Sequence, residues 1–184
     1  MKKSAQVHKG FTLVELLVVI AIIAILAAVV VLIINPLELT RRGRDAARLT
    51  DLANLQQAIN VAVQEATASA AAILCSGGAT PCSGSSNTGT RATGGTGWVK
   101  VNLSAQNSVS VPTLPIDPLN DTTNHYTYCS DGDAWEINTV LESEQQKGKM
   151  ATDGGNEPAA DTTGRYEVGS NLTLIAASGG SCTY

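Results

Sequence analysis

The sequence predicts an α+β protein in which one long N-terminal helix packs on a small antiparallel sheet. Residues 11–34 form an apolar run of 24 residues whose only charge is Glu15. Residues 35–72 then carry apolar side chains at three- and four-residue spacing, which is typical of an amphipathic helix. Residues 73–184 alternate short β-prone stretches with turn formers, which favours a loop-rich sheet.

The composition limits the size and the kind of domain. The 184 residues allow one membrane segment and one small folded domain. The formal net charge of -4 argues against a nucleic-acid binder, and aromatic residues make up only 4% of the chain. A compact soluble enzyme usually buries more large side chains, so we expect a modest domain with long polar loops.

The apolar run 11–34 is long enough to cross a membrane. As a helix it spans about 36 Å, whereas a hydrocarbon core is roughly 30 Å thick. A cleaved secretory signal has a shorter apolar region of about 7–15 residues followed by an A-x-A site. The alanines of this run include no pair two residues apart. A plain signal anchor fits the length, but it explains Glu15 only by its place near the helix start, where the dipole favours a carboxylate.

The residues before the run resemble a specific processing signal. A basic leader containing Lys2, Lys3 and Lys9 precedes the hexapeptide GFTLVE, residues 10–15. This arrangement resembles the class III signal of type IV pilins and type II secretion pseudopilins. The resemblance implies that prepilin peptidase cuts between Gly10 and Phe11 on the cytoplasmic side and methylates the new N-terminus at Phe11. Residues 1–10 are then a cleaved leader, and residues 11–34 form the transmembrane and filament-core helix of a pilin-like fold.

The same resemblance implies an assembly role for Glu15. A carboxylate is expensive in a lone membrane helix. In a filament of parallel helices, an axial offset of about four residues, near 6 Å, brings the Phe11 ammonium of one subunit level with the Glu15 of its neighbour. Two opposite charges attract strongly in such a low-dielectric bundle, so Glu15 is expected to align the subunits.

The helix continues past the membrane span with two features that need interpretation. Asn35-Pro36 predicts a kink or local break. The amphipathic stripe, which begins at Leu49 and runs to about residue 72, resembles the second half of a pseudopilin helix, although any helix that packs on a sheet predicts it too. The cluster Arg41, Arg42, Arg44 and Arg48 either meets anionic headgroups and later acidic groups of neighbouring subunits, or is a solvated collar.

The head is predicted to combine a low-complexity loop with three to five strands. Residues 67–97 are rich in Gly, Ser, Thr and Ala, and such a composition predicts a surface loop. The strand candidates that follow are residues 98–103, 109–111, 126–129, 135–141, 166–168 and 172–175.

Four cysteines in an exported head favour disulfides. Three connectivities exist, and we favour Cys75–Cys82 with Cys129–Cys182. The second bridge lies close to the place where many pilins pin their C-terminal loop. Zinc is the rival, but the spacing between Cys75 and Cys82 is wider than the tight pairs of zinc sites.

Catalytic motifs are missing from the sequence, which has no G-x-S-x-G, no H-E-x-x-H and no P-loop, so we expect no enzyme activity and no catalytic residue. Calcium is the one cofactor that the resemblance raises, because major pseudopilins hold a calcium ion in their C-terminal loop region. Its oxygen ligands here are Asp153, Asn156, Glu157 and Asp161. A solvated acidic loop is the other reading of this stretch.

The sequence therefore predicts a structural subunit of a type IV pilus-like or type II secretion pseudopilus filament. Its expected partners are identical or homologous subunits, prepilin peptidase, the inner-membrane assembly platform and, before assembly, the lipid bilayer. The leader is expected in the cytoplasm and the head outside, first on a single-pass membrane protein and then on a cell-surface or periplasmic filament. The alternative is a monomeric membrane-anchored extracellular binding module, which needs neither Glu15 nor the Gly10-Phe11 site.

Overall fold

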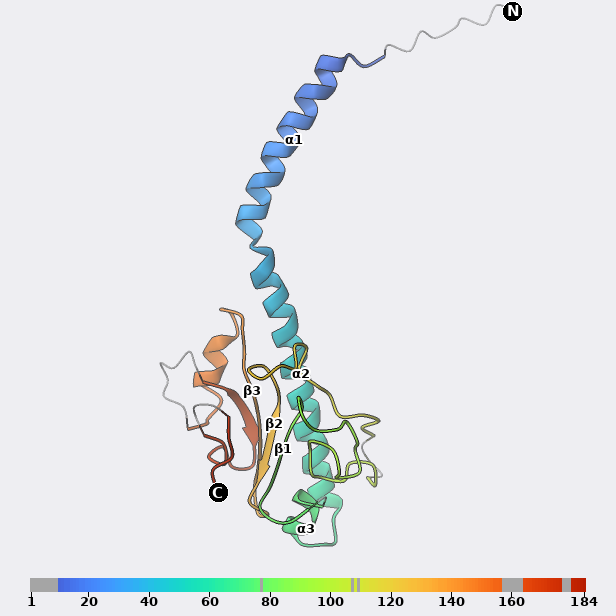
Figure 1. The fold of residues 1–184 in the computed structure, drawn as a ribbon, viewed down its shortest axis with the longest axis vertical. Helices are drawn as coiled ribbons and strands as arrows, with labels where there is room; N and C mark the ends of the chain where they lie inside the picture. The colour runs from blue at the N-terminus through green and yellow to red at the C-terminus, as the bar shows by residue number, and fades with distance from the viewer. Residues whose placement is uncertain (1–9, 77, 107, 109, 157–163, 177–179) are drawn as a thin grey trace, which may run out of the picture. The chain divides into compact units, whose positions relative to one another are not determined.

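The computed structural model of the chain describes all residues except 1–9, 77, 107, 109, 157–163 and 177–179. The described residues fall into two compact units, one that ends at Leu39 and one that spans Thr40–Tyr184. The elements in chain order are α1 (Leu13–Ile34), α2 (Pro36–Glu65), α3 (Ala70–Leu74), β1 (Cys82–Ser85), β2 (Thr127–Ser130), β3 (Trp135–Thr139), the 3-10 helix η1 (Lys147–Ala151) and β4 (Tyr166–Gly169) (Figure 1).

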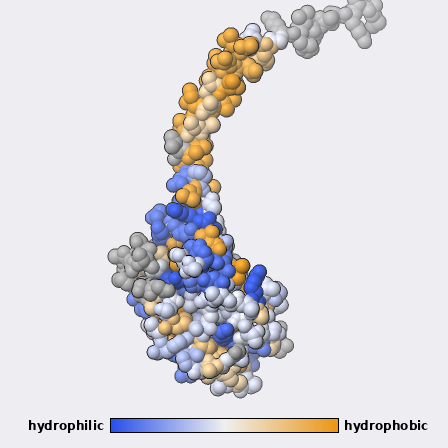
Figure 2. Space-filling model, in the orientation of Figure 1, coloured by the Kyte–Doolittle hydropathy of each residue, from blue (hydrophilic) through white to orange (hydrophobic). Residues whose placement is uncertain are grey.

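Helix α1 exposes its apolar side chains. The stretch Leu13–Val31 is long and apolar enough to cross a membrane, and none of it is buried inside the protein. Figure 2 shows these hydrophobic side chains on the surface of the helix. A soluble core helix would bury one face, so the exposure of the whole helix requires another apolar environment.

Asn35 separates α1 from α2. Its φ of 45° ends α1 in the left-handed conformation, and its side-chain oxygen accepts the backbone N–H of Glu38 at 3.3 Å. Pro36 follows at the first position of α2, where a missing N–H costs no hydrogen bond. The break predicted at Asn35-Pro36 is present, and one residue caps both helices.

Helix α2 packs one face on the sheet through a buried stripe. Its members include Leu52, Leu55, Ile59 and Ala62, at three- and four-residue spacing. The stripe was expected to continue to about residue 72, but α2 ends at Glu65. The side chain of Ser69 accepts the N–H of Ala72, and this cap starts the separate short helix α3.

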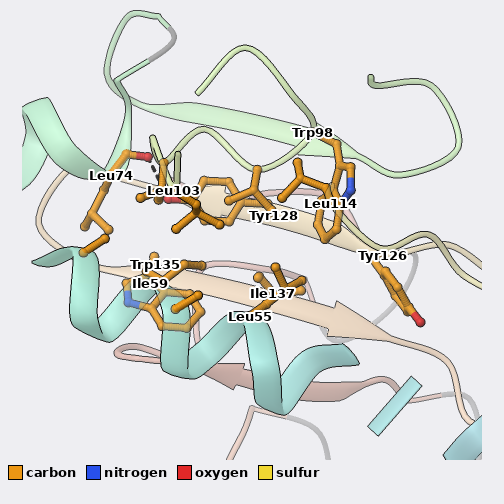
Figure 3. Packing of buried hydrophobic residues seen from close by; sticks show 14 of the residues in the cluster. Leu55, Ile59, Leu74, Trp98, Leu103, Leu114, Tyr126, Tyr128, Trp135 and Ile137 are labelled. Atoms are coloured by element: carbon orange, nitrogen blue, oxygen red, sulfur yellow. Dashed lines mark hydrogen bonds between the residues drawn. The ribbon is translucent and has the colours of Figure 1, made fainter. Parts of the chain in front are cut away.

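The sheet has four antiparallel strands in the order β1-β2-β3-β4. In the register, Tyr128 lies opposite Gly84 and Ile137, and Ile137 lies opposite Val168. Tyr128, Ile137 and Val168 therefore share the face that meets α2. Figure 3 shows Tyr128 and Ile137 in one cluster with Leu55 and Ile59 of α2. This confirms the predicted layout of an apolar N-terminal helix followed by a small antiparallel sheet.

The other face of the sheet is polar and is covered by the C-terminal segment. Glu136 is fully buried there, and its Oε2 accepts the backbone N–H groups of Leu174 and Ile175 at 2.8 and 3.0 Å. A short bridge pairs Ile175 with Cys182. The last residues therefore complete the head instead of trailing from it.

Three strand candidates and the loop 67–97 differ from their predictions. Residues 98–103 and 172–175 make only isolated bridges, and residues 110–111 belong to no strand, while residue 109 lies outside the described part. The backbone of 98–103 instead bonds the preceding loop, as in Trp98 N–H to Thr90 O at 3.0 Å. That loop contains β1, which lacks β-prone residues because Gly84 packs against the backbone of Trp98, where a Cβ would overlap the carbonyl group.

Candidate assembly site

The predicted cleavage junction lies just before α1. Gly10 and Phe11 are both exposed, and Phe11 exposes 86% of its surface. The leader residues 1–9, including Lys2, Lys3 and Lys9, lie outside the described residues. An exposed, non-helical junction has the backbone accessibility that a peptidase needs.

Glu15 takes part in a capping box at the start of α1. The hydroxyl and the backbone N–H of Thr12 donate to Glu15 Oε2 at 2.7 and 2.9 Å, and Glu15 N–H donates to the Thr12 hydroxyl at 3.3 Å. Thr12 is the N-cap and Glu15 stands at the third helical position, as this motif requires. Glu15 therefore has a local structural role in the single chain. From the sequence, the helix dipole was the one local explanation of its position.

Two disulfides tie the head together in the pairing favoured from the sequence. Cys75 bonds Cys82, and Cys129 bonds Cys182. The first bridge links the end of α3 to β1, and the second links β2 to the C-terminal segment, so adjacent strands each carry one bridge. Two hydrogen bonds support the first bridge. The Tyr128 hydroxyl donates to Leu74 O at 2.7 Å (Figure 3), and the Tyr184 hydroxyl donates to Cys82 O at 2.8 Å.

A buried ionic cluster fixes α2 to two loops of the head. The fully buried guanidinium of Arg48 donates to both oxygens of Asp117 at 2.6 and 3.0 Å. The Nη1 nitrogen of Arg48 donates to Asp45 at 2.9 Å and to Glu142 at 2.7 Å. Arg44 adds two bonds to Glu142 at 2.7 and 2.8 Å. Two arginines and three carboxylates thus occupy one site.

The carboxylates of this cluster are also held by the backbone. Asp45 accepts the N–H groups of Glu142 and Ser143, and Asp117 accepts those of Leu119 and Asn120. The hydrogen bond from Arg44, together with Arg48, lowers the pKa of Glu142 below its usual value. Direct hydrogen bonds thus join two guanidinium groups to three carboxylates, and the cluster acts as a structural clamp on α2.

The cluster corrects the interpretation of the four arginines. Arg48 is buried and Arg44 pairs with Glu142, so neither is available to lipid headgroups or to another subunit, and neither belongs to a solvated collar. Arg42 is exposed on α2, whereas Arg41 is half-buried. Sequence spacing does not reveal the cluster because two of its three carboxylates, Asp117 and Glu142, lie 69 and 94 residues from Arg48.

The predicted calcium ligands fall partly outside the described residues. Glu157 and Asp161 lie there, whereas Asp153 and Asn156 are described. Asp153 accepts the backbone N–H groups of Gly155 and Glu167 at 3.1 and 2.9 Å, and Asn156 donates to Ile175 O at 3.2 Å. Within the described part of the chain, no three His, Cys, Asp or Glu side chains gather as a metal site. Calcium stays a prediction.

Comparison with known proteins identifies the N-terminal segment. Residues 6–31 match the family model of the prokaryotic N-terminal methylation motif. No curated protein and no solved structure matches the chain significantly.

The matched segment includes Gly10, Phe11 and Glu15, and it ends inside α1. Residues 6–31 therefore carry the class III signal that occurs in type IV pilins and pseudopilins. The motif is found on structural proteins that prepilin peptidase processes, and with the apolar α1 it indicates a membrane-anchored protein with an exported head.

Proposed function

We propose that this chain is a structural subunit of a type IV pilus-like or type II secretion pseudopilus filament, and that it is not an enzyme. The observation that carries the proposal is the methylation motif at residues 6–31 on a helix that buries none of its apolar surface within the protein. Such a helix needs a bilayer or a bundle of like helices around it. The bilayer surrounds the helix before assembly, and the neighbouring helices of the filament surround it afterwards.

Prepilin peptidase prepares the subunit by cutting between Gly10 and Phe11. The cut removes three lysines, so nine basic side chains remain against 16 acidic ones. It also creates an ammonium group at Phe11, one residue before the capping box. The mature N-terminus is then a positive charge that lies four residues from Glu15.

Glu15 has two consecutive roles in this proposal. In the free subunit its carboxylate caps α1 through Thr12. In the filament the second carboxylate oxygen of Glu15 accepts a hydrogen bond from the Phe11 ammonium of a neighbour that is offset by about 6 Å along the axis. Because a buried charge needs a partner, this pairing selects one axial register.

The test replaces Glu15 by Gln, which keeps the shape and the capping capacity because Gln also serves at this position of a capping box. Thr12→Ala is the matched control, since it removes the cap and leaves the charge. We expect Glu15→Gln protein to be inserted, cleaved and stable but to give few filaments, whereas Thr12→Ala gives near-normal yield. Membrane-fraction and sheared-filament levels of the three proteins, with cleavage checked by mass, measure this.

Three results would contradict the proposal. If Glu15→Gln and Thr12→Ala reduce filament yield equally, Glu15 acts only through the helix cap. Normal filament yield from Glu15→Gln refutes the alignment role, and a wild-type chain that never leaves the membrane as filaments favours the monomeric binding module.

A further inference from the structure

A hydroxyl-lined hollow of about 470 Å³ lies on the polar face of the sheet, between β1, β2 and the C-terminal segment. Ser83 and Ser85 alternate along β1, so both side chains point to this face. Thr127 lies opposite Ser85 in β2 and faces the same way. The other hydroxyls come from Ser181 and Tyr184. Among the described residues, no charged side chain lines the hollow, so it offers neutral hydrogen-bonding groups.

Thr127 places an unused hydrogen-bonding group in this hollow. Only 4% of Thr127 is exposed, and none of the described residues provides its hydroxyl with a hydrogen-bond partner. Its neighbour on β3 is Asn138, which is fully buried and whose Nδ2 likewise has no partner among these residues. A buried polar group without a partner costs free energy, and native structures leave few of them. Thr127 therefore gains from a ligand that supplies a hydrogen bond.

Tyr184 adds an aromatic wall whose position is fixed. Its hydroxyl donates to Cys82 O at 2.8 Å, while 60% of the residue stays exposed. The segment that carries it is tied to β2 by the Cys129–Cys182 disulfide. A ring that is held at its polar end keeps an apolar face open to a ligand. Because the wall is already ordered, binding does not have to immobilise it.

We propose that this hollow binds a neutral saccharide through one of its sugar rings. A sugar ring carries several hydroxyl groups that donate and accept hydrogen bonds, and Ser and Thr hydroxyls can take either role in return. The C–H face of the ring is apolar and packs on an aromatic side chain such as Tyr184. The volume lies within the range of small-molecule sites, about 300–1,000 Å³. One head is sufficient for this binding, so the inference does not depend on the filament role.

The buried hydroxyl of Thr127 is the contact that decides the affinity. Ser83 and Ser181 are exposed, so a bond from either to the sugar replaces a bond to water. Thr127 gains a bond that it lacks in the free head. Thr127→Val keeps the shape of the side chain and removes only this hydroxyl. The substitution should therefore weaken binding without destabilising the head.

Saturation-transfer NMR tests the proposal on the mature chain in lauryldimethylamine oxide, a detergent without a sugar headgroup. The probes are the methyl glycosides of glucose, galactose, mannose and N-acetylglucosamine, with methyl glucuronide as the charged comparison. We expect a neutral glycoside to receive saturation from the protein. Thr127→Val should weaken its affinity by about fivefold, and Tyr184→Ala by about tenfold.

Thr122→Val is the matched control, because Thr122 is exposed and does not line the hollow, and it should leave the affinity unchanged. Equal urea midpoints of Thr127→Val and wild type would show that folding is intact. If Thr127→Val unfolds at lower urea, Tyr184→Ala decides alone, since Tyr184 lies at the surface.

Three outcomes overturn the proposal. The first is that none of the neutral glycosides receives saturation. The second is an affinity that Tyr184→Ala and a folded Thr127→Val leave unchanged. The third is that methyl glucuronide binds more tightly than every neutral glycoside.

Discussion

Replacing Arg48 by Met is expected to destabilise the head strongly. The change removes four hydrogen bonds and leaves Asp45, Asp117 and Glu142 close together in a site where Arg48 is fully buried. Removing one partner of a buried ionic group typically costs about 3–5 kcal/mol. With a urea m-value of about 2 kcal/mol per M, the midpoint of unfolding should fall by about 2 M.

Tryptophan fluorescence of the detergent-solubilised mature chain measures this loss. Both tryptophans, Trp98 and Trp135, are buried in the head and report its unfolding. Arg41→Met is the matched control, since it removes a half-buried arginine of the same helix that lies outside the ionic cluster, and it should shift the midpoint little. In a double-mutant cycle, Asp117→Asn should cost less once Arg48 is absent.

The pH dependence supplies a second check of the same cluster. Because the pKa of Glu142 is lowered in the folded chain, the stabilisation is present above its usual value of 4.5 and is lost as the pH falls through the lowered pKa. Glu142→Gln should reduce this loss of folding stability at acidic pH. The clamp would be refuted if Arg48→Met and the control Arg41→Met unfolded at the same urea midpoint. Fully additive effects of Arg48→Met and Asp117→Asn would refute it too.

Mass spectrometry of protein from the native host should show a chain that begins at Phe11 with a methyl group on its nitrogen, and an intact leader in assembled protein would reject the class III assignment. Burial and the charge of Arg165 lower the pKa of His125 in the folded chain, so the unfolded chain binds the proton first and the head should become less stable as the pH falls below about 6.5. Urea titrations should show that His125→Gln removes this dependence of the unfolding free energy on pH. An unchanged dependence in His125→Gln would contradict the account. Calcium titration by calorimetry should give binding to the wild-type chain that Asp153→Asn weakens at least about tenfold, whereas equal heats with and without the substitution would identify the loop as solvated.

The sequence alone was sufficient for the features that depend on local pattern. The unbroken apolar run predicts α1, and the β-prone stretches around Tyr128 and Ile137, bounded by turn formers, predict β2 and β3. The leader and GFTLVE predict the processing signal. In each case the responsible residues are neighbours in the chain.

The remaining features depend on contacts between distant segments. Nothing in the sequence CSGS indicates the strand β1, because its small residues are required by the backbone of Trp98, which packs against Gly84. Arg48 looks like one more surface arginine until Asp117 and Glu142 are placed beside it. The end of α2 at Glu65 is likewise set by Ser69, whose capping bond competes with continuation of the helix.

Because Asn35 caps both α1 and α2, the length of α1 can change separately from α2. Asn35 ends α1, and α2 begins with the backbone N–H groups of Glu38 and Leu39 donating to Asn35 itself. Residues can be added to or removed from α1 without disturbing the register of the buried stripe on α2. A mismatch of a few ångströms between span and bilayer has a modest energetic cost. The span can therefore adapt to membranes of different thickness while the head keeps its structure.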